Sequence, residues 1–406
     1  MYRCRAISLI AGVLIAHGCL CQTDLNSIQV EEKSYQLYLN KEWNGLIDFG
    51  KVAIDSGVDY FYLRLRLGIA YYETDRYRLA EAQFRKALEF NSQDDISREY
   101  QYYSLLYSEQ YDEARRCAVE MSDALKKKLH VSEWKATNMV FMEGGPKIPS
   151  TSTQFGTAVY VHGGLNHSIS NKISLTHAIT YYGQNLVEGS FSQIQYYING
   201  SIPLKNGWLI SPTFQYVERS LSSTSTTPGP KGPGPPKPPQ TIQSTTSSSA
   251  WVGSVSLAKR FGYADVSLAS VISNVEGYSQ FIEQATLTIY PLANSRLSLG
   301  AFGYYHWGTT YLGEFAINPF ISFRPARKLY LQANYFRNNN VNIIERNGYI
   351  VNNSPDVTSS RWSVVADLSI LKKTSFYGLF IFENKANVIT GNYTYSTFIL
   401  GLKHIF

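Results

Sequence analysis

The feature that most constrains this chain is a series of alternating segments that runs from about residue 134 to the C-terminus. There are roughly fourteen segments of about ten to sixteen residues, each bounded by Gly, Asn, Pro or charged residues. In one of them Trp362 and Val364 share a face, while Ser363 and Ser369 share the opposite face. Such segments predict antiparallel strands with an apolar face toward lipid and a polar face toward water, because a soluble sandwich would turn its apolar faces inward.

These segments predict an antiparallel transmembrane β-barrel of about fourteen strands over residues 131–406, as the second part of an α+β multidomain chain. Twelve strands is the alternative, if the weak segment near Asn138 and one other segment do not cross the membrane. The last segment has the ending that is typical of outer-membrane barrels, an alternating apolar run closed by an aromatic residue: Phe398, Leu400, Leu402 and Phe406. We therefore expect the outer membrane of a Gram-negative bacterium.

Loop lengths predict the orientation of the barrel. The longest connections, near 221–246 and 341–357, follow odd-numbered segments, and tight turns such as 206–207 and 372–373 follow even-numbered ones. If the first strand starts in the periplasm, long extracellular loops should follow odd-numbered strands and short periplasmic turns should follow even-numbered ones. Both long connections are therefore predicted to be extracellular loops. The first contains a Pro-rich stretch, 228–240, which predicts an extended or disordered insertion, with binding of a surface ligand as the alternative. Tryptophans near strand ends match interfacial girdles: Trp208, Trp251, Trp307 and Trp362.

The N-terminus resembles a secretory signal peptide, predicted over residues 1–21. Basic Arg3 and Arg5 precede an apolar stretch that is too short to span a membrane as a helix. A lipoprotein acylated at Cys19 is the alternative. Cleavage after residue 21 would leave Cys117 as the one cysteine of the mature chain, so no intramolecular disulfide is expected.

Apolar residues follow helical spacing from about Tyr35 to Leu129, which predicts a helical domain over residues 22–130. Within it, LGIAYYETDRYRLAEAQFRKALEF places Leu67, Gly68, Tyr71, Ala80, Phe84 and Ala87 at spacings that resemble a tetratricopeptide repeat. The roughly 34-residue period carries Ala80 to Ala114, which predicts about three repeats, the neighbours being degenerate. Arrays of this family usually present a concave face to a peptide or protein, so a periplasmic partner is implied. A packed helical spacer without a partner is the alternative.

Composition and motifs argue against several function classes. The net charge of +6 is small for 406 residues and scattered, so nucleic acid is not an expected partner. The sequence has no GxSxG, Walker or CxxC motif, and none of the seven His shows metal-ligand spacing with a Cys or carboxylate partner. His162 and His167 differ by an odd number on one strand, so they face opposite sides. We expect neither an enzyme nor a cofactor or metal.

Inward-facing positions of the predicted strands are rich in Gln, Asn, Ser, Thr and Tyr, which suits a water-filled lumen. Candidate lumen residues are Gln195, Gln215, Asp265, Arg361 and Asp367. Asp265, Asp367 and Glu283 are also the carboxylates that a rim-located enzyme would need, although isolated barrel charges usually pair with a cation or with backbone. We favour the pairing role.

The order of a repeat array followed by a barrel resembles the exporters of exopolysaccharides and, more closely, the smaller YaiO-type outer-membrane family. The resemblance rests on the repeat residues, the domain order and Phe406. It implies that the barrel passes a polysaccharide or other polar solute, while the array recruits a periplasmic protein or guides the polymer. Outer-membrane lipid and the barrel-assembly machinery would be further partners. The alternative is a structural scaffold that holds a periplasmic protein without transport.

Overall fold

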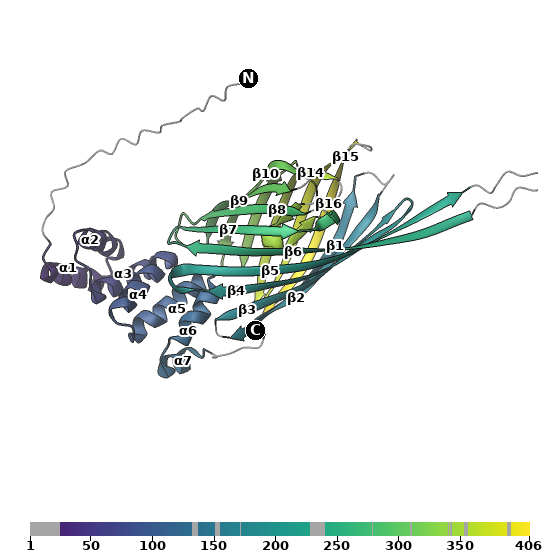
Figure 1. Cartoon of the computed structure of the whole chain (residues 1–406). Helices are drawn as coiled ribbons and strands as arrows, with labels where there is room; N and C mark the ends of the chain where they lie inside the picture. The colour runs from purple at the N-terminus through teal and green to yellow at the C-terminus, as the bar shows by residue number, and fades with distance from the viewer. Residues whose placement is uncertain are drawn as a thin grey trace, which may run out of the picture.

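The computed structural model describes residues 25–406 except 132–136, 151–154, 171, 228–239, 278, 309–310, 340, 342, 353–355 and 388–390. The predicted signal peptide and nearly all of the Pro-rich stretch lie outside the described residues. Figure 1 shows a body of helices beside one end of a barrel. Within the described ranges, no helix is both long and apolar enough to cross a membrane.

The helical body contains α1 (Ser27–Leu39), α2 (Trp43–Asp55), α3 (Phe61–Glu73), α4 (Tyr77–Phe90), α5 (Asp95–Tyr107), α6 (Tyr111–Val119) and α7 (Asp123–Leu129). Polar side chains begin several of these helices, because they accept hydrogen bonds from backbone N–H groups that have no partner in the first turn. The Asp94 carboxylate accepts from the Ser97 N–H at 2.6 Å, and the Ser122 hydroxyl accepts from the Leu125 N–H at 3.1 Å.

Close packing joins α3 to α4. A Cβ atom added at Gly68 would lie 2.5 Å from the Phe84 ring, so only glycine permits this approach. Leu67, Tyr71, Ala80 and Phe84 share one buried cluster, Ala87 is also fully buried, and Ala114 packs in a second cluster with Leu105 and Cys117. All seven residues that the repeat pattern singled out therefore lie in the interior of the helical body.

The barrel has fourteen antiparallel strands in a closed ring, which confirms the predicted fold class and the larger of the two strand numbers. The strands are β1 (Met139–Pro149), β2 (Phe155–Ser170), β3 (Ile173–Leu186), β4 (Gly189–Pro203), β5 (Trp208–Thr227), β6 (Gln240–Arg260), β7 (Ala264–Ser273), β8 (Gln280–Ile289), β9 (Leu297–Gly308), β10 (Tyr311–Ala326), β11 (Leu329–Arg337), β14 (Val357–Leu371), β15 (Thr374–Asn387) and β16 (Gly391–Ile405). The weak segment near Asn138 is β1, whose pairing with β16, from Met139 with Ile405 to Pro149 with Tyr395, closes the ring.

The outer surface of the ring is apolar, as a lipid-facing surface requires. Phe315 and Leu400 are 74% and 77% exposed, and the four girdle tryptophans also face outward. The C-terminal run shares this face, since Phe398, Leu402 and Phe406 are exposed. The Phe406 N–H donates to the Asn138 carbonyl at 3.0 Å, which joins the chain's end to the residue that precedes β1.

The first long connection differs from the prediction. Residues 221–227 and 240–246 are not loop but the paired ends of β5 and β6, with Thr227 opposite Gln240. The two strands form a ribbon that projects beyond the rest of the barrel (Figure 1). Cross-strand hydroxyl pairs, such as Ser223 with Ser244 at 2.7 Å, accompany the backbone ladder. Alternation did not reveal these ends, because a ribbon beyond the membrane needs no apolar face.

The second long connection contains a small hairpin instead of an open loop. It consists of β12 (Ile343–Glu345), the 3-10 turn η3 (Arg346–Gly348) and β13 (Ile350–Asn352). Arg346, Asn347 and Gly348 all adopt positive φ, the backbone that a tight hairpin turn needs. Residues 343–352, named here the internal hairpin, fold back inside the barrel.

Candidate channel and its internal hairpin

An apolar contact holds one face of the internal hairpin to the barrel wall. Ile343, Ile344 and Val351 belong to a buried cluster with inward-facing residues of β5 to β11, namely Val217, Ala250, Val252, Val271, Ile282, Tyr304, Ala316 and Phe336. Apolar side chains on the inside of a barrel are unusual where water fills the lumen. Here they supply the surface against which the hairpin packs.

Polar side chains fix the hairpin backbone just beyond this cluster. Gln284 of β8 contributes both of its amide atoms: Nε2 donates to the Ile344 carbonyl at 3.3 Å, and Oε1 accepts from the Asn347 N–H at 2.8 Å. The Ser254 hydroxyl of β6 donates to the Asn347 carbonyl at 2.7 Å. These contacts satisfy backbone groups that would otherwise be buried without partners.

A buried ion pair ties the hairpin to β14. Nη2 of Arg361 lies 2.7 Å from both carboxylate oxygens of Glu345, whose side chain is fully buried. The guanidinium also lies 4.7 Å from the centre of the Phe336 ring, and Asn318 donates to Glu345 at 3.3 Å. A buried carboxylate is tolerated only with such compensation.

The turn of the hairpin reaches the opposite wall. The Tyr349 hydroxyl is 2.7 Å from His162 Nε2 on β2, and the Tyr349 ring meets the Tyr197 ring of β4 edge-on at 5.0 Å. Thr180 on β3 hydrogen-bonds the other nitrogen of His162 at 2.8 Å. The hairpin therefore bridges the lumen, with contacts on both sides of the barrel.

The wall formed by β14 to β16 and β1 to β3 is polar and rich in tyrosine. Its charges are paired or hydrogen-bonded: Lys147 lies 2.5 Å from Glu383, and Lys385 donates to Thr358 at 2.7 Å. Tyrosine hydroxyls join the same network: Tyr160 and Tyr377 donate to Glu143, and Tyr393 donates to Asp356. At Gln184, the Tyr182 hydroxyl donates to the side-chain oxygen and the Tyr395 hydroxyl accepts from the side-chain nitrogen. Cations and carboxylates are interspersed, so this wall has no large region of one charge.

The five candidate lumen residues occupy four places. Gln195 and Gln215 are buried neighbours, joined by a hydrogen bond of 2.8 Å, and Gln195 also donates to the Val351 carbonyl of the hairpin at 3.5 Å. Arg361 binds Glu345 as described. Asp367 pairs with Lys403 at 3.1 Å, farther along β14 toward its end at Leu371. Asp265 lies at the rim near the helices.

The other rim candidate, Glu283, lies on the outward face of β8, where Ser270 donates to it at 2.8 Å. The candidate carboxylates are thus not gathered in one place. Sequence reasoning missed Glu345 and Tyr349, because their segment resembled a solvent-exposed loop. The signal that could have found them is the Asn347-Gly348 pair, flanked by two short apolar runs, which is typical of a hairpin turn.

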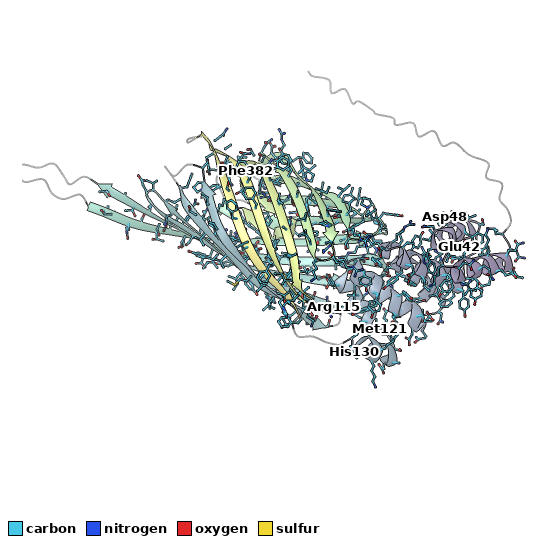
Figure 2. The ribbon with its side chains drawn as sticks, turned by 180° about the vertical axis from the view of Figure 1, so that it is seen from behind. Glu42, Asp48, Arg115, Met121, His130 and Phe382 are labelled. Carbon is cyan, nitrogen blue, oxygen red and sulfur yellow. The ribbon has the colours of Figure 1, made fainter. Side chains whose placement is uncertain are left out.

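The helices adjoin the barrel end that carries the short turns (Figure 1). Arg78, whose side chain is 2% exposed, pairs with Asp265 and donates to the Phe261 and Gly262 carbonyls. Glu113 of α6 pairs with Arg260, and burial raises the pKa of Glu113 although this arginine opposes the shift. Figure 2 shows Arg115 at this junction, where it donates to Ser168 at 2.7 Å.

A cavity of about 280 Å³ remains between the helices and these turns. Its lining includes Arg85, Arg98, Gln101, Arg116, Lys205 and Asn206. The junction is therefore polar and strongly charged. Within the described part of the chain, no three or more His, Cys, Asp or Glu residues are arranged to hold a metal ion.

No protein-family model matches the sequence, and no curated protein is significantly similar to it. Solved structures that show similarity to this chain include the Pseudomonas putida toluene transporter TodX, with 8% identity, a TM-score of 0.46, and 67% of this chain and 91% of that chain covered. A Pseudomonas aeruginosa FadL homologue has 11% identity and a TM-score of 0.41, with coverages of 66% and 89%. The NanC porin has 8% identity and a TM-score of 0.34, with coverages of 66% and 100%. All three TM-scores are below 0.5, so nothing about this chain's cargo follows from those proteins.

Proposed function

We propose that this chain is an outer-membrane channel for a polar solute, and that the internal hairpin forms its constriction. The observation that supports this most directly is the closed ring of strands with an apolar outside and a hydrogen-bonding, charged inside. Tyrosine, amide and charged side chains line the wall from β14 through β16 and β1 to β3, as a water-filled passage requires. The hairpin occupies the same lumen and sets its free cross-section.

The cargo that best fits the lining is uncharged and rich in hydroxyl groups, such as a segment of polysaccharide. Tyrosine offers an apolar ring together with a hydroxyl, so it can contact both the C–H and the O–H groups of such a solute. Charges such as Lys147 and Glu383 compensate one another, so they create little preference for an anion or a cation. This inference concerns the chemical class of the solute only.

The helical body is proposed to be a short tetratricopeptide array on the periplasmic side. Its position beside the short turns supports a role at the inner mouth, either guiding the solute or recruiting a periplasmic protein. The packing of Gly68 against Phe84 supports the repeat assignment, since this contact is what the repeat pattern requires.

A scaffold without transport is the second candidate, and one observation favours it. The hairpin is tied to both walls, by Glu345 on one side and Tyr349 on the other. A constriction fixed in this way would close the pore if it never moves. In that case the helical body would be the functional part, and the barrel would serve as its membrane anchor.

Planar-bilayer conductance of refolded residues 22–406 distinguishes the two candidates. A variant with residues 343–352 replaced by a short Gly-Ser linker should show larger, ohmic conductance than the unmodified chain. The matched control shortens the β5–β6 ribbon by replacing residues 226–241, which lie beyond the pairing with β4, by an Asn-Gly turn, and its conductance should equal that of the unmodified chain.

Liposome swelling with neutral and charged sugars of equal size then tests the cargo class. Faster entry of the neutral sugar through the hairpin variant supports the proposal. Absence of conductance in all three proteins, with the barrel shown to be folded, would contradict the channel and favour the scaffold.

A further inference from the structure

Two histidines on the outward face of the barrel lie close together. His167 of β2 and His177 of β3 are diagonal neighbours, since His167 is opposite Leu175 and His177 is opposite Leu165. Their Nε2 atoms are 3.1 Å apart, and their ring planes are nearly parallel, with an angle of 14° between them and 5.1 Å between the ring centres. This arrangement is independent of the lumen, because both side chains point away from it.

A neighbouring strand fixes the orientation of one of these rings. The Tyr196 hydroxyl of β4 is 2.6 Å from Nδ1 of His177. If Nδ1–H donates to this oxygen, the lone pair of Nε2 is directed at His167. Histidines that bind metal ions usually have this arrangement, in which the second ring nitrogen donates to an oxygen and sets the tautomer.

The separation of the two Nε2 atoms also fits a shared ion. Metal–imidazole bonds of about 2.0–2.1 Å, at an angle of roughly 90–110°, place two ligand nitrogens roughly 3 Å apart. The ion would lie to one side of the line that joins the two nitrogens, so both rings would turn about their side-chain bonds to bind it, and no shift of either strand is required.

We propose that His167 and His177 form a two-histidine site for a divalent transition-metal ion, with Tyr196 as the residue that positions His177. Imidazole ligands suit Zn²⁺, Ni²⁺ and Cu²⁺ better than Mg²⁺ or Ca²⁺. Water fills the remaining coordination positions, because only the two histidines supply nitrogen. The bound ion would join β2 to β3 on the face opposite to Ser168 and Ser174, which contact Arg115 of the helical body.

The location permits access from water. Strand β2 ends at Ser170 and β3 begins at Ile173, so both histidines lie within four residues of the strand ends that the turn connects. The same turn is at the barrel end that meets the helices, as the Arg115 contacts show. The site is thus near the inner edge of the membrane-spanning surface, where an ion and its water ligands remain accessible.

Isothermal titration of the refolded, tag-free chain with Zn²⁺ tests the proposal. We expect one ion per chain, loss of that binding in His167→Ala and in His177→Ala, and an affinity reduced about 10–100-fold in Tyr196→Phe. His404→Ala is the matched control: His404 is also near the inner end of its strand, where Nδ1 contacts Thr374 at 2.9 Å, and this variant should bind like the unmodified chain.

Electron paramagnetic resonance with Cu²⁺ gives an independent readout. Couplings to two imidazole nitrogens are expected in the unmodified chain and in His404→Ala. Resistance of the barrel to unfolding in cold detergent confirms that each variant is folded. Equal Zn²⁺ affinity in the unmodified chain and a His167→Ala/His177→Ala double variant, or a Cu²⁺ spectrum with fewer than two nitrogens, would overturn the proposal.

Discussion

Nη2 of Arg361 on β14 lies 2.7 Å from each carboxylate oxygen of Glu345, and this is the one ion pair that joins the internal hairpin to the barrel among the residues the structure describes. Replacing Arg361 by Met leaves the Glu345 carboxylate buried without its cation. Loss of one partner of a buried pair typically costs about 3–5 kcal/mol. We therefore expect Arg361→Met to release the hairpin, which single-channel recording would detect as more frequent or larger openings.

The double variant Arg361→Met/Glu345→Met is the control for this prediction. It replaces both charges by apolar side chains of similar length, so most of the lost stability should return. Amide hydrogen exchange of Ile344 provides the stability measurement, because its carbonyl and neighbouring backbone lie within the anchored part of the hairpin. Exchange in Arg361→Met as slow as in the unmodified chain would show that the ion pair does not hold the hairpin.

Packing inside the helical body gives a second prediction, which concerns two glycines. Alanine at position 68 would place its methyl group 2.5 Å from the Phe84 ring, so we expect destabilisation by about 1–3 kcal/mol. At Gly45 in α2 the nearest atom would be 3.5 Å away, and there alanine should stabilise by up to about 1 kcal/mol. Thermal unfolding followed by far-ultraviolet circular dichroism measures both. The same sign for both substitutions would contradict the packing argument.

The alternation of side chains was sufficient to predict the fourteen strands, because the outward face of the ring is apolar along most of each strand. Trp362 and Val364 must be apolar wherever their strand lies in the ring. The ends of β5 and β6 could not be predicted in this way, since residues such as Ser223 and Ser244 lie on a ribbon that needs only cross-strand partners. Their sequence is equally compatible with a loop.

Long-range contacts explain why the candidate site was only partly predictable. Gln195, Gln215 and Arg361 could be assigned to the lumen from the face on which they fall. The hairpin could not be placed there, because its location depends on partners far away in the sequence, such as Gln284 for Ile344. The contact between His167 and His177 likewise depends on the register of β2 and β3, which spacing along the chain does not define.

The junction between helices and barrel leads to a third prediction, a comparison of two ion pairs. Arg78 is 2% exposed where it pairs with Asp265, whereas Arg296 and Asp75 are 60% and 41% exposed in theirs. A double-mutant cycle to alanine should give a coupling of about 0.5–3 kcal/mol for the buried pair. The exposed pair should give about 0–1 kcal/mol, because water and salt screen it.

Denaturant unfolding of the helical body, with the barrel intact, gives the free energy of unfolding of each variant and hence the coupling free energy of each cycle. The Arg78–Asp265 coupling free energy should also persist at high salt, because the Arg78 side chain is 2% exposed and salt screens buried pairs much less than exposed ones. A coupling for Arg78 and Asp265 no larger than that of the exposed pair would mean that the helices are held to the barrel by other contacts.

The two glutamates Glu113 and Glu31 should give the helical body opposite responses to pH. Burial raises the pKa of Glu113 above its unfolded value of 4.5, so its contribution to stability is present below pH 4.5 and is lost as pH rises through the folded pKa. The hydrogen bond from Arg66 lowers the pKa of Glu31, so the contribution of Glu31 to stability is present above pH 4.5 and is lost as pH falls through the folded pKa.

Melting temperatures of Glu113→Gln and Glu31→Gln, measured from pH 3 to pH 8 against the unmodified chain, test both signs. Glu113→Gln should gain stability relative to the unmodified chain as pH rises, and Glu31→Gln should lose it. Parallel pH profiles for the two variants would show that neither carboxylate has the environment described here.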